Sequence, residues 1–179
     1  MDGKAYLAST LEEFHKLRDL AERAIAQVST EQLFHVPGPE CNSIAVIMKH
    51  IGGNLRSRWS NALTTDGEKP DRNRDAEFER EERDTAQSIR ARWDQGWDTV
   101  LATFARLKPE QVEATMTIRG EPFTLLQATH RSLTHTSQHV GQIVYLAKLV
   151  AGPGWKTLSI PRGQSAAFNQ APTPYHRKG

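Results

Sequence analysis

Hydrophobic side chains recur at three- and four-residue steps along four separate stretches of this chain, and polar side chains fill the positions between them. This spacing puts the hydrophobic positions on one face of an α-helix. The stretches cover residues 5–28, 43–64, 84–107 and 124–151. Amphipathic helices of this kind bury their apolar faces against one another. The pattern therefore predicts an all-α fold, a four-helix bundle.

Capping residues mark where the last three helices begin. Ser43 is a favourable N-cap for the second helix, and Asp84, followed by Gln87, is the predicted cap of the third. Thr124 and Gln127 have the spacing of a capping box at the start of the fourth helix. We therefore expect these three helices to begin at these residues.

Two of the connections between helices carry information about topology. Residues 114–118 alternate between polar and apolar, and after a turn at Arg119 and Gly120 the segment 121–124 follows, which predicts a small β-hairpin before the fourth helix. The connection over residues 64–84 is far longer than a tight antiparallel turn requires. We therefore expect a crossover that leaves the second and third helices parallel.

The composition is that of a soluble globular protein, with 37% hydrophobic and 25% charged residues. The length fits one domain, which we assign to residues 1–179 with a C-terminal segment at 152–179. No apolar run approaches the roughly 20 residues needed to cross a bilayer, and the first residues lack a signal-peptide pattern. The single Cys41 cannot form an internal disulfide. We therefore expect a cytoplasmic protein without membrane association.

The net charge of +2 is spread unevenly along the chain. Residues 66–84 carry nine acidic and five basic side chains, whereas residues 152–179 carry four basic and no acidic ones. Basic tails occur in nucleic-acid-binding proteins, but these cations are widely spaced and do not form a stacking platform with aromatic residues. We therefore expect a solvated terminus and no nucleic-acid partner.

His135 and His139 are four residues apart in the fourth predicted helix, so their imidazoles point in directions about 40° apart, one turn from each other. Two histidines at this spacing can coordinate one metal ion, although pairs of core or surface histidines also arise by chance. The pair continues the stripe that faces the bundle interior, together with Ala128, Gln142 and Leu146. Because buried imidazoles need polar partners, a metal ion shared by both is the favoured interpretation.

A third ligand must come from another helix, and His50 is the histidine in the middle of the second one. Asn54 lies one turn further along, in a polar stripe that either faces solvent or lines a cavity under the crossover. His130 projects about 140–180° away from the histidine pair by helical count, so we expect it at the surface or rim. The predicted metal ligands are therefore His50, His135 and His139.

Three histidine ligands leave at least one coordination position open, as in catalytic metal sites. Imidazole suits zinc, nickel, iron and copper, and we favour zinc or nickel as the divalent ion. Asn54 and Gln142 are candidates for contact with the ligands or with substrate, or else they fill polar gaps between helices. Arg72 and Arg74 on the crossover either meet an anionic substrate or pair with the aspartates beside them in the sequence.

Taken together, these residues resemble the DinB-like superfamily of bacterial four-helix metalloproteins. The resemblance rests on His50 in the second helix and on His135-x3-His139, followed after Val140 by Gly141 and Gln142. Longer segments resemble an uncharacterised branch of the superfamily, namely residues 50–55, 64–70, 72–78 and 155–161. The resemblance covers nearly the whole chain.

This resemblance implies an up-down-down-up bundle, a divalent metal ion on three histidines, and frequent homodimers. Better-understood relatives include S-transferases and isomerases that use the thiols bacillithiol or mycothiol, so a small-molecule thiol and an electrophilic substrate are the implied partners. Val140 stands where many relatives carry a histidine or an arginine, so this chain departs from them beside its last ligand.

Two functions are compatible with these observations. The first is a metal-dependent enzyme that transfers a low-molecular-weight thiol, or that carries out metal-assisted hydrolysis. The second is a non-catalytic metal-binding or stress-response protein whose bundle serves as a platform for a ligand or partner. The spacing places no general acid or base near the histidines.

The tryptophans bear on packing and assembly. Trp93 and Trp97 share the inward stripe of the third helix, where large aromatics usually contribute to the core. Trp59 points about 180° away from His50 on the second helix, so it either packs within its own chain or is covered by a second subunit in a homodimer.

The C-terminal segment contains three apolar residues, Trp155, Leu158 and Ile160. They are apolar enough to fold back onto the bundle. We expect this segment and the crossover to form a roof over the metal site.

Overall fold

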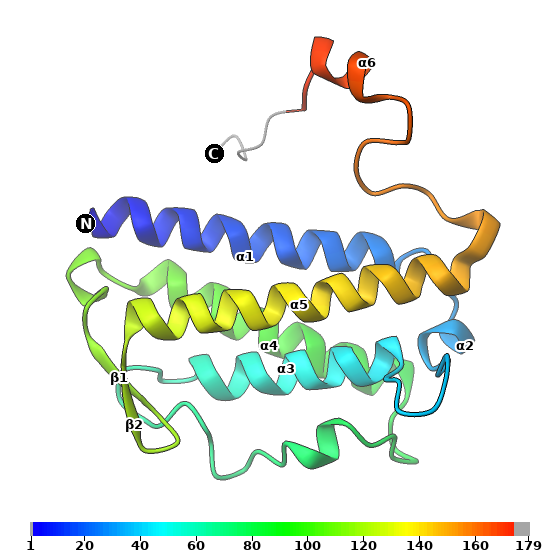
Figure 1. The fold of residues 1–179 in the computed structure, drawn as a ribbon. Coiled ribbons are helices and arrows are strands. Elements are labelled where there is room, and N and C mark those ends of the chain that lie inside the picture. The colour runs from blue at the N-terminus through cyan, green and yellow to red at the C-terminus, as the bar shows by residue number, and fades with distance from the viewer. Residues whose placement is uncertain (1, 174–179) are drawn as a thin grey trace.

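The computed structural model describes residues 2–173 and is dominated by four long helices packed side by side (Figure 1). They are α1 (Gly3–Ile25), α3 (Ile44–Trp59), α4 (Ala86–Arg106) and α5 (Leu125–Ala151). The predicted all-α bundle is confirmed.

Short elements connect these helices. They are α2 (Thr30–Leu33), η1 (Asp75–Glu77), η2 (Pro109–Gln111), β1 (Thr115–Ile118), β2 (Glu121–Thr124), η3 (Gly152–Gly154) and α6 (Ser165–Gln170). Strands β1 and β2 pair antiparallel, with Thr115 opposite Thr124 and Ile118 opposite Glu121, which confirms the predicted hairpin. Within the described range, no helix is long and apolar enough to cross a membrane.

The helices α1 and α5 run in one direction along the bundle, whereas α3 and α4 run in the other (Figure 1). The connection from α3 to α4, residues 60–85, therefore returns along the bundle on the outer side of α3. This confirms the predicted crossover with two parallel helices and the up-down-down-up order. The crossover also covers a face of α3 that would otherwise meet solvent.

Two of the three predicted helix caps are confirmed. The hydroxyl of Ser43 accepts the backbone N–H of Val46, and Thr124 and Gln127 form both bonds of a capping box. The first helix ends at Ile25, earlier than predicted, because the chain then turns into the separately capped α2.

The predicted cap of α4 is wrong by one residue. Thr85, not Asp84, is the N-cap, and it exchanges capping-box bonds with Ser88 rather than Gln87. Asp84 instead forms an ion pair with the buried ammonium group of Lys49. The Nζ atom of Lys49 lies 2.7 Å from Oδ2 of Asp84. A buried lysine without a partner would destabilise the fold. The carboxylate of Asp84 therefore pairs with Lys49 and does not cap the helix.

Three tryptophans occupy the centre of the core. Trp59, Trp93 and Trp97 are all fully buried, which confirms the core prediction for the pair on α4. Trp59 packs edge-on against Phe104 and donates its indole N–H to the hydroxyl of Ser132 at 3.1 Å. Of the two alternatives for Trp59, packing within its own chain is confirmed and cover by a second subunit is wrong. The homodimer itself stays a prediction.

The helices α3 and α4 meet at two glycines. A Cβ atom on Gly96 would lie 2.5 Å from the carbonyl oxygen of Gly52, and one on Gly52 would lie 2.5 Å from that of Arg92. Neither position has room for a side chain, so the two backbones pack in direct contact. His50 precedes Gly52 by two residues and is therefore carried on a firmly held part of α3.

The C-terminal segment follows α5 and lies against the end of α1. Arg23 donates to the carbonyl oxygen of Leu158 at 2.9 Å, and Gln27 forms two hydrogen bonds with the backbone of the same segment. Trp155 and Leu158 pack on the core as predicted, whereas Ile160 remains 38% exposed.

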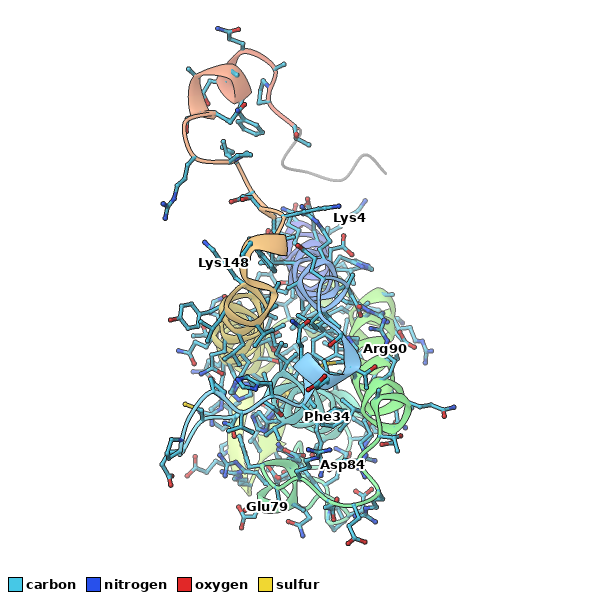
Figure 2. All side chains as sticks on the ribbon, turned by 90° about the vertical axis from the view of Figure 1, so that its right-hand side faces the viewer. Lys4, Phe34, Glu79, Asp84, Arg90 and Lys148 are labelled. Carbon is cyan, nitrogen blue, oxygen red and sulfur yellow. The ribbon has the colours of Figure 1, made fainter. Side chains whose placement is uncertain are left out.

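This segment does not roof the histidines. It stands on the side of the bundle opposite Glu79 and Asp84, two residues of the crossover (Figure 2). The predicted C-terminal contribution to the roof is therefore wrong for the described residues.

Candidate metal centre

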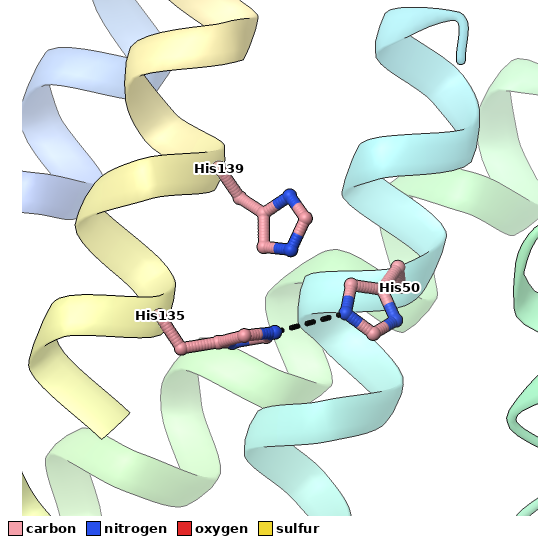
Figure 3. A group of neighbouring side chains, drawn as sticks. All are labelled: His50, His135 and His139. Atoms are coloured by element: carbon pink, nitrogen blue, oxygen red, sulfur yellow. Dashed lines mark hydrogen bonds between the residues drawn. The ribbon is translucent and has the colours of Figure 1, made fainter. Parts of the chain in front are cut away.

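His50 on α3 and the pair His135 and His139 on α5 converge between the two helices (Figure 3). Their ring centroids form a nearly regular triangle with sides of 5.1, 4.9 and 4.6 Å. One ring nitrogen from each histidine lies within 4.8 Å of the other two, and Nε2 of His50 is 3.1 Å from Nε2 of His135. The fold therefore brings the three predicted ligands to one point.

A buried carboxylate fixes the orientation of His50. Oε2 of Glu77, on η1 in the crossover, lies 2.9 Å from Nδ1 of His50, and both side chains are almost fully buried. An ionised carboxylate only accepts hydrogen bonds, so Nδ1 carries the proton and Nε2 faces the other histidines with its lone pair. Metal-binding histidines are commonly held by a partner of this kind.

Arg72 in turn holds Glu77. Its Nε and Nη2 donate to the two carboxylate oxygens at 2.8 and 2.7 Å. Burial alone would raise the pKa of Glu77, but hydrogen bonds from Arg72 and His50 outweigh it and lower that pKa. The alternative in which Arg72 pairs with Asp71 or Asp75 is wrong, because Glu77 offers it both oxygens inside a buried site.

Gly53 leaves the space that this carboxylate fills. A Cβ atom at position 53 would overlap Oε1 of Glu77. Glu77 cannot move aside without giving up its bonds to Arg72 and His50. The absence of a side chain at position 53 is therefore a condition for the position of the carboxylate.

Gln142 plays the matching role for His139. Its Oε1 lies 2.8 Å from Nδ1 of His139, three residues earlier on α5. With the amide oxygen as acceptor, Nδ1 carries the proton and Nε2 remains available to a ligand. Of the two roles that the sequence left open for Gln142, this contact favours the one beside a metal ligand.

Burial keeps His135 neutral. Loss of solvent is the largest influence on its pKa, and the charges of His139, His50 and Arg72 act in the same direction, lowering the pKa to about 3. Burial also lowers the pKa of His139. Metal ions bind imidazole in its neutral form, so at neutral pH neither ring must first lose a proton.

The donor set fits a divalent metal ion. Two nitrogens bound at about 2.0–2.1 Å to one tetrahedral zinc ion are roughly 3.3 Å apart. The 3.1 Å between the Nε2 atoms of His50 and His135 is close to that separation. Three imidazoles, two of them oriented by Glu77 and Gln142, could therefore hold such an ion.

A cavity of about 570 Å³ opens beside the histidines. It is lined by His50, Asn54, Arg58, Arg72, Arg74, Arg119, His130, Arg131, Ser132, Thr134, His135 and Gln138. Asn54 thus lies in a cavity wall rather than facing open solvent. Arg74 lies there too, with Nη1 3.7 Å from a carboxylate oxygen of Asp75, the neighbour expected to pair with it. His130 is exposed at the rim, as predicted.

The sequence matches the family described as "Protein of unknown function (DUF1572)" over residues 2–164. The chain belongs to the DUF1572 family. The matched range contains the three histidines and both side chains that orient them. No curated protein and no solved structure matches the chain.

Sequence reasoning alone does not single out four residues of this DUF1572 site, namely Glu77, Arg58, Arg119 and Arg131. Glu77 lies in a crossover whose charges follow no helical period, so periodicity gives no indication that it is buried. The sequence feature that could have indicated Glu77 is the segment 72–78, which is one of the segments that carry the family resemblance. The three arginines come from separate elements, and only the folded chain brings them to one cavity.

Proposed function

We propose that the protein is a metal-dependent enzyme of the DinB-like superfamily that binds one divalent ion, zinc or nickel, through His50, His135 and His139. The observation that carries this proposal is the triangle of imidazoles with its two orienting partners, Glu77 and Gln142. Structural zinc sites are usually closed by four protein ligands, whereas catalytic sites keep one position open. Three histidines beside a cavity favour the catalytic type.

The reaction that the site supports best is transfer of a low-molecular-weight thiol to an electrophile, with metal-assisted hydrolysis as the alternative. A bound ion would supply the Lewis acidity that lowers the pKa of a thiol or water in its open position. The described lining of the cavity holds no carboxylate, and Glu77 is occupied by His50 and Arg72. This favours a nucleophile acidic enough to react without a strong base, as a thiol is.

Neighbouring residues of the chain orient the ligands of the site. Glu77 and Gln142 fix the rings of His50 and His139. Phe78 covers the ring of His50, with the two ring centroids 4.4 Å apart. Ligands held in fixed orientations favour a single coordination geometry.

Metal content after purification tests the ligand assignment. Elemental analysis should find one divalent ion per chain in the wild type and little in His135→Ala or His139→Ala. His130→Ala is the matched control, since this histidine lies on the same helix at the cavity rim, and it should keep the metal. Equal loss in all three variants would refute the assignment.

Activity requires a second measurement. The metal-loaded protein should consume a chloronitrobenzene electrophile with at least one of several thiols, among them cysteine, glutathione, bacillithiol and mycothiol, and His139→Ala should not. Metal binding without turnover of any thiol or ester substrate would support the alternative, a non-catalytic metal-binding protein.

A further inference from the structure

The cavity beside the histidines has an unusual concentration of positive charge. Five of its described lining residues are arginines, and none is an aspartate or glutamate. The arginines are Arg58, Arg72, Arg74, Arg119 and Arg131. Arginine side chains repel one another unless anions lie between them, so a wall of this composition requires an explanation.

These arginines come from distant parts of the chain. Arg58 lies on α3 and Arg131 on α5, while Arg119 lies in the turn between β1 and β2. The carboxylate of Asp66 accepts the backbone N–H groups of Arg119 and Gly120 at 2.9 and 2.8 Å, which fixes this turn against the crossover. The fold therefore brings arginines from α3, α5, the crossover and the hairpin turn to one cavity wall.

Carboxylates behind the wall neutralise only part of this charge. Glu68 lies 3.2 Å from both Arg72 and Arg119 and 4.0 Å from Arg58, so three guanidinium groups share one carboxylate. Glu77 adds a second carboxylate, on Arg72, and Asp75 a third, 3.7 Å from Arg74. Arg131 has no ion pair among the described residues. The wall therefore keeps a net positive charge toward the cavity.

Arg58 is the arginine of this wall whose burial is least compensated by hydrogen bonds. It is only 6% exposed, and its Nη1 is buried without a hydrogen-bond partner in the described part of the chain. Burial lowers its pKa to about 10, and neighbouring Arg72, Arg131 and Arg119 act in the same direction against Glu68. The group is still a cation at neutral pH. A buried cation with too few partners is destabilising, and such features are retained mainly where a ligand uses them.

We propose that this cavity binds the anionic group of a small substrate, a carboxylate or phosphate, next to the metal centre. The inference rests on the proposed function for the reaction, but anion binding itself follows from the arginines alone. Guanidinium groups recognise carboxylate and phosphate oxygens through paired, charge-assisted hydrogen bonds. His50 and His135 line the same cavity as the arginines. One substrate molecule could therefore place its anionic group on the arginines and its reacting group at the metal centre.

The surroundings favour a small molecule over a nucleic acid. The cationic groups are concentrated in a cavity of about 570 Å³, a size suited to a small molecule. The chain has a net charge of only +2, and the crossover that forms one wall carries nine acidic residues over positions 66–84. An extended phosphate backbone would have to pass over these carboxylates, which would repel it.

Calorimetric titration of the metal-free protein tests the proposal without relying on the metal. The probes are succinate and inorganic phosphate, with neutral succinamide as the uncharged control. Wild-type protein should bind at least one anion and not succinamide, and the affinity should fall as salt is added, because screening weakens the attraction. The preferred anion identifies the carboxylate or the phosphate as the recognised group.

Two variants locate the binding site. Arg119→Gln and Arg131→Gln change exposed side chains, so both should fold, and each should weaken anion binding about tenfold through loss of one charge-assisted interaction. Arg162→Gln, an exposed arginine of the C-terminal segment, should bind as the wild type does. A check of folding by circular dichroism accompanies each titration.

The proposal would be overturned by no binding of either anion, by equal affinity in all three arginine variants, or by tighter binding of a short single-stranded oligonucleotide. Binding that occurs only after metal loading and is unchanged in the variants would place the anion on the metal and also overturn it. Failure of the proposed function looks different, since the metal-free protein would then bind anions while metal loading or turnover fails.

Discussion

Glu77 and His50 are 27 residues apart in the chain, yet a 2.9 Å hydrogen bond joins them in a site that is almost closed to solvent. The crossover supplies the carboxylate and α3 supplies the imidazole, so this bond ties an irregular segment to a helix. It fixes the proton on one ring nitrogen and leaves the other for a metal ion. The crossover is therefore part of the candidate metal centre as well as a covering for α3.

Glu77→Gln should weaken metal binding without abolishing it. The amide can still accept the proton of His50 but cannot hold Arg72 with two oxygens, and loss of such orienting partners typically lowers metal affinity about 10- to 100-fold. Competition with a coloured chelator measures this affinity. Glu79→Gln, an exposed residue of the same crossover, is the control and should match the wild type. The same affinity in both variants would show that Glu77 does not position the ligand.

Gly53→Ala should also reduce metal affinity, although position 53 does not contact a metal ion. The new methyl group would occupy the space of the Glu77 carboxylate and push it away from His50, and such overpacking also costs about 1–3 kcal/mol of stability. Gly141→Ala, at a helix position with open space around it, should be neutral or stabilising. Chelator competition and urea denaturation of the two variants separate these effects. Unchanged metal affinity in Gly53→Ala would contradict the role of the glycine.

Trp97→Ala should lower the free energy of unfolding by about 3–5 kcal/mol, because it removes a fully buried aromatic side chain and leaves a cavity. Trp93→Ala should cost a similar amount. Trp155→Ala, in the partly buried C-terminal segment, should cost less. Urea denaturation followed by circular dichroism gives the three values. Unchanged stability together with lost ligand binding would show that these tryptophans serve the site and not the core.

The metal-free protein should become less stable as the pH falls below neutral. The pKa of His135 is lowered to about 3 in the folded protein, from an ordinary value of 6.5. Unfolding therefore takes up a proton between these values, so stability that is fully present above 6.5 is lost as the pH falls through this window.

Denaturant titrations at about pH 7 and pH 5 measure this loss largely above the range in which carboxylates titrate. Wild-type protein should lose more stability between these two conditions than His135→Gln, which lacks the titrating group. An equal loss in the two proteins would assign the pH dependence to other residues.

Local features of the sequence determined the helices and the histidine pair. Hydrophobic periodicity and capping residues act within one or two turns, so four helices, two caps and the hairpin could be predicted from neighbouring residues. The four-residue spacing of His135 and His139 likewise follows from helix geometry alone. The length of the connection over 64–84 indicated the crossover, because a short turn would have forced α3 and α4 to be antiparallel.

Tertiary structure decided what surrounds α3. Helical counting placed Trp59 on the side away from His50, but that side faces the core too, and 13 of the 16 residues of α3 are buried. Helix α4, helix α5 and the crossover enclose α3. The model of an amphipathic helix with one buried and one exposed face therefore does not apply to α3. A pattern within one helix cannot show how many neighbours will surround it.

The same reason explains why Glu77 and Arg119 could not be predicted as parts of the site. Their positions depend on where an irregular crossover and a hairpin turn lie against the bundle, and irregular segments have no period from which a buried face can be identified. The sequence by itself determined which side chains could bind a metal ion. Only the folded chain determined which carboxylate orients His50 and that five arginines meet beside it, because these contacts join segments far apart in sequence.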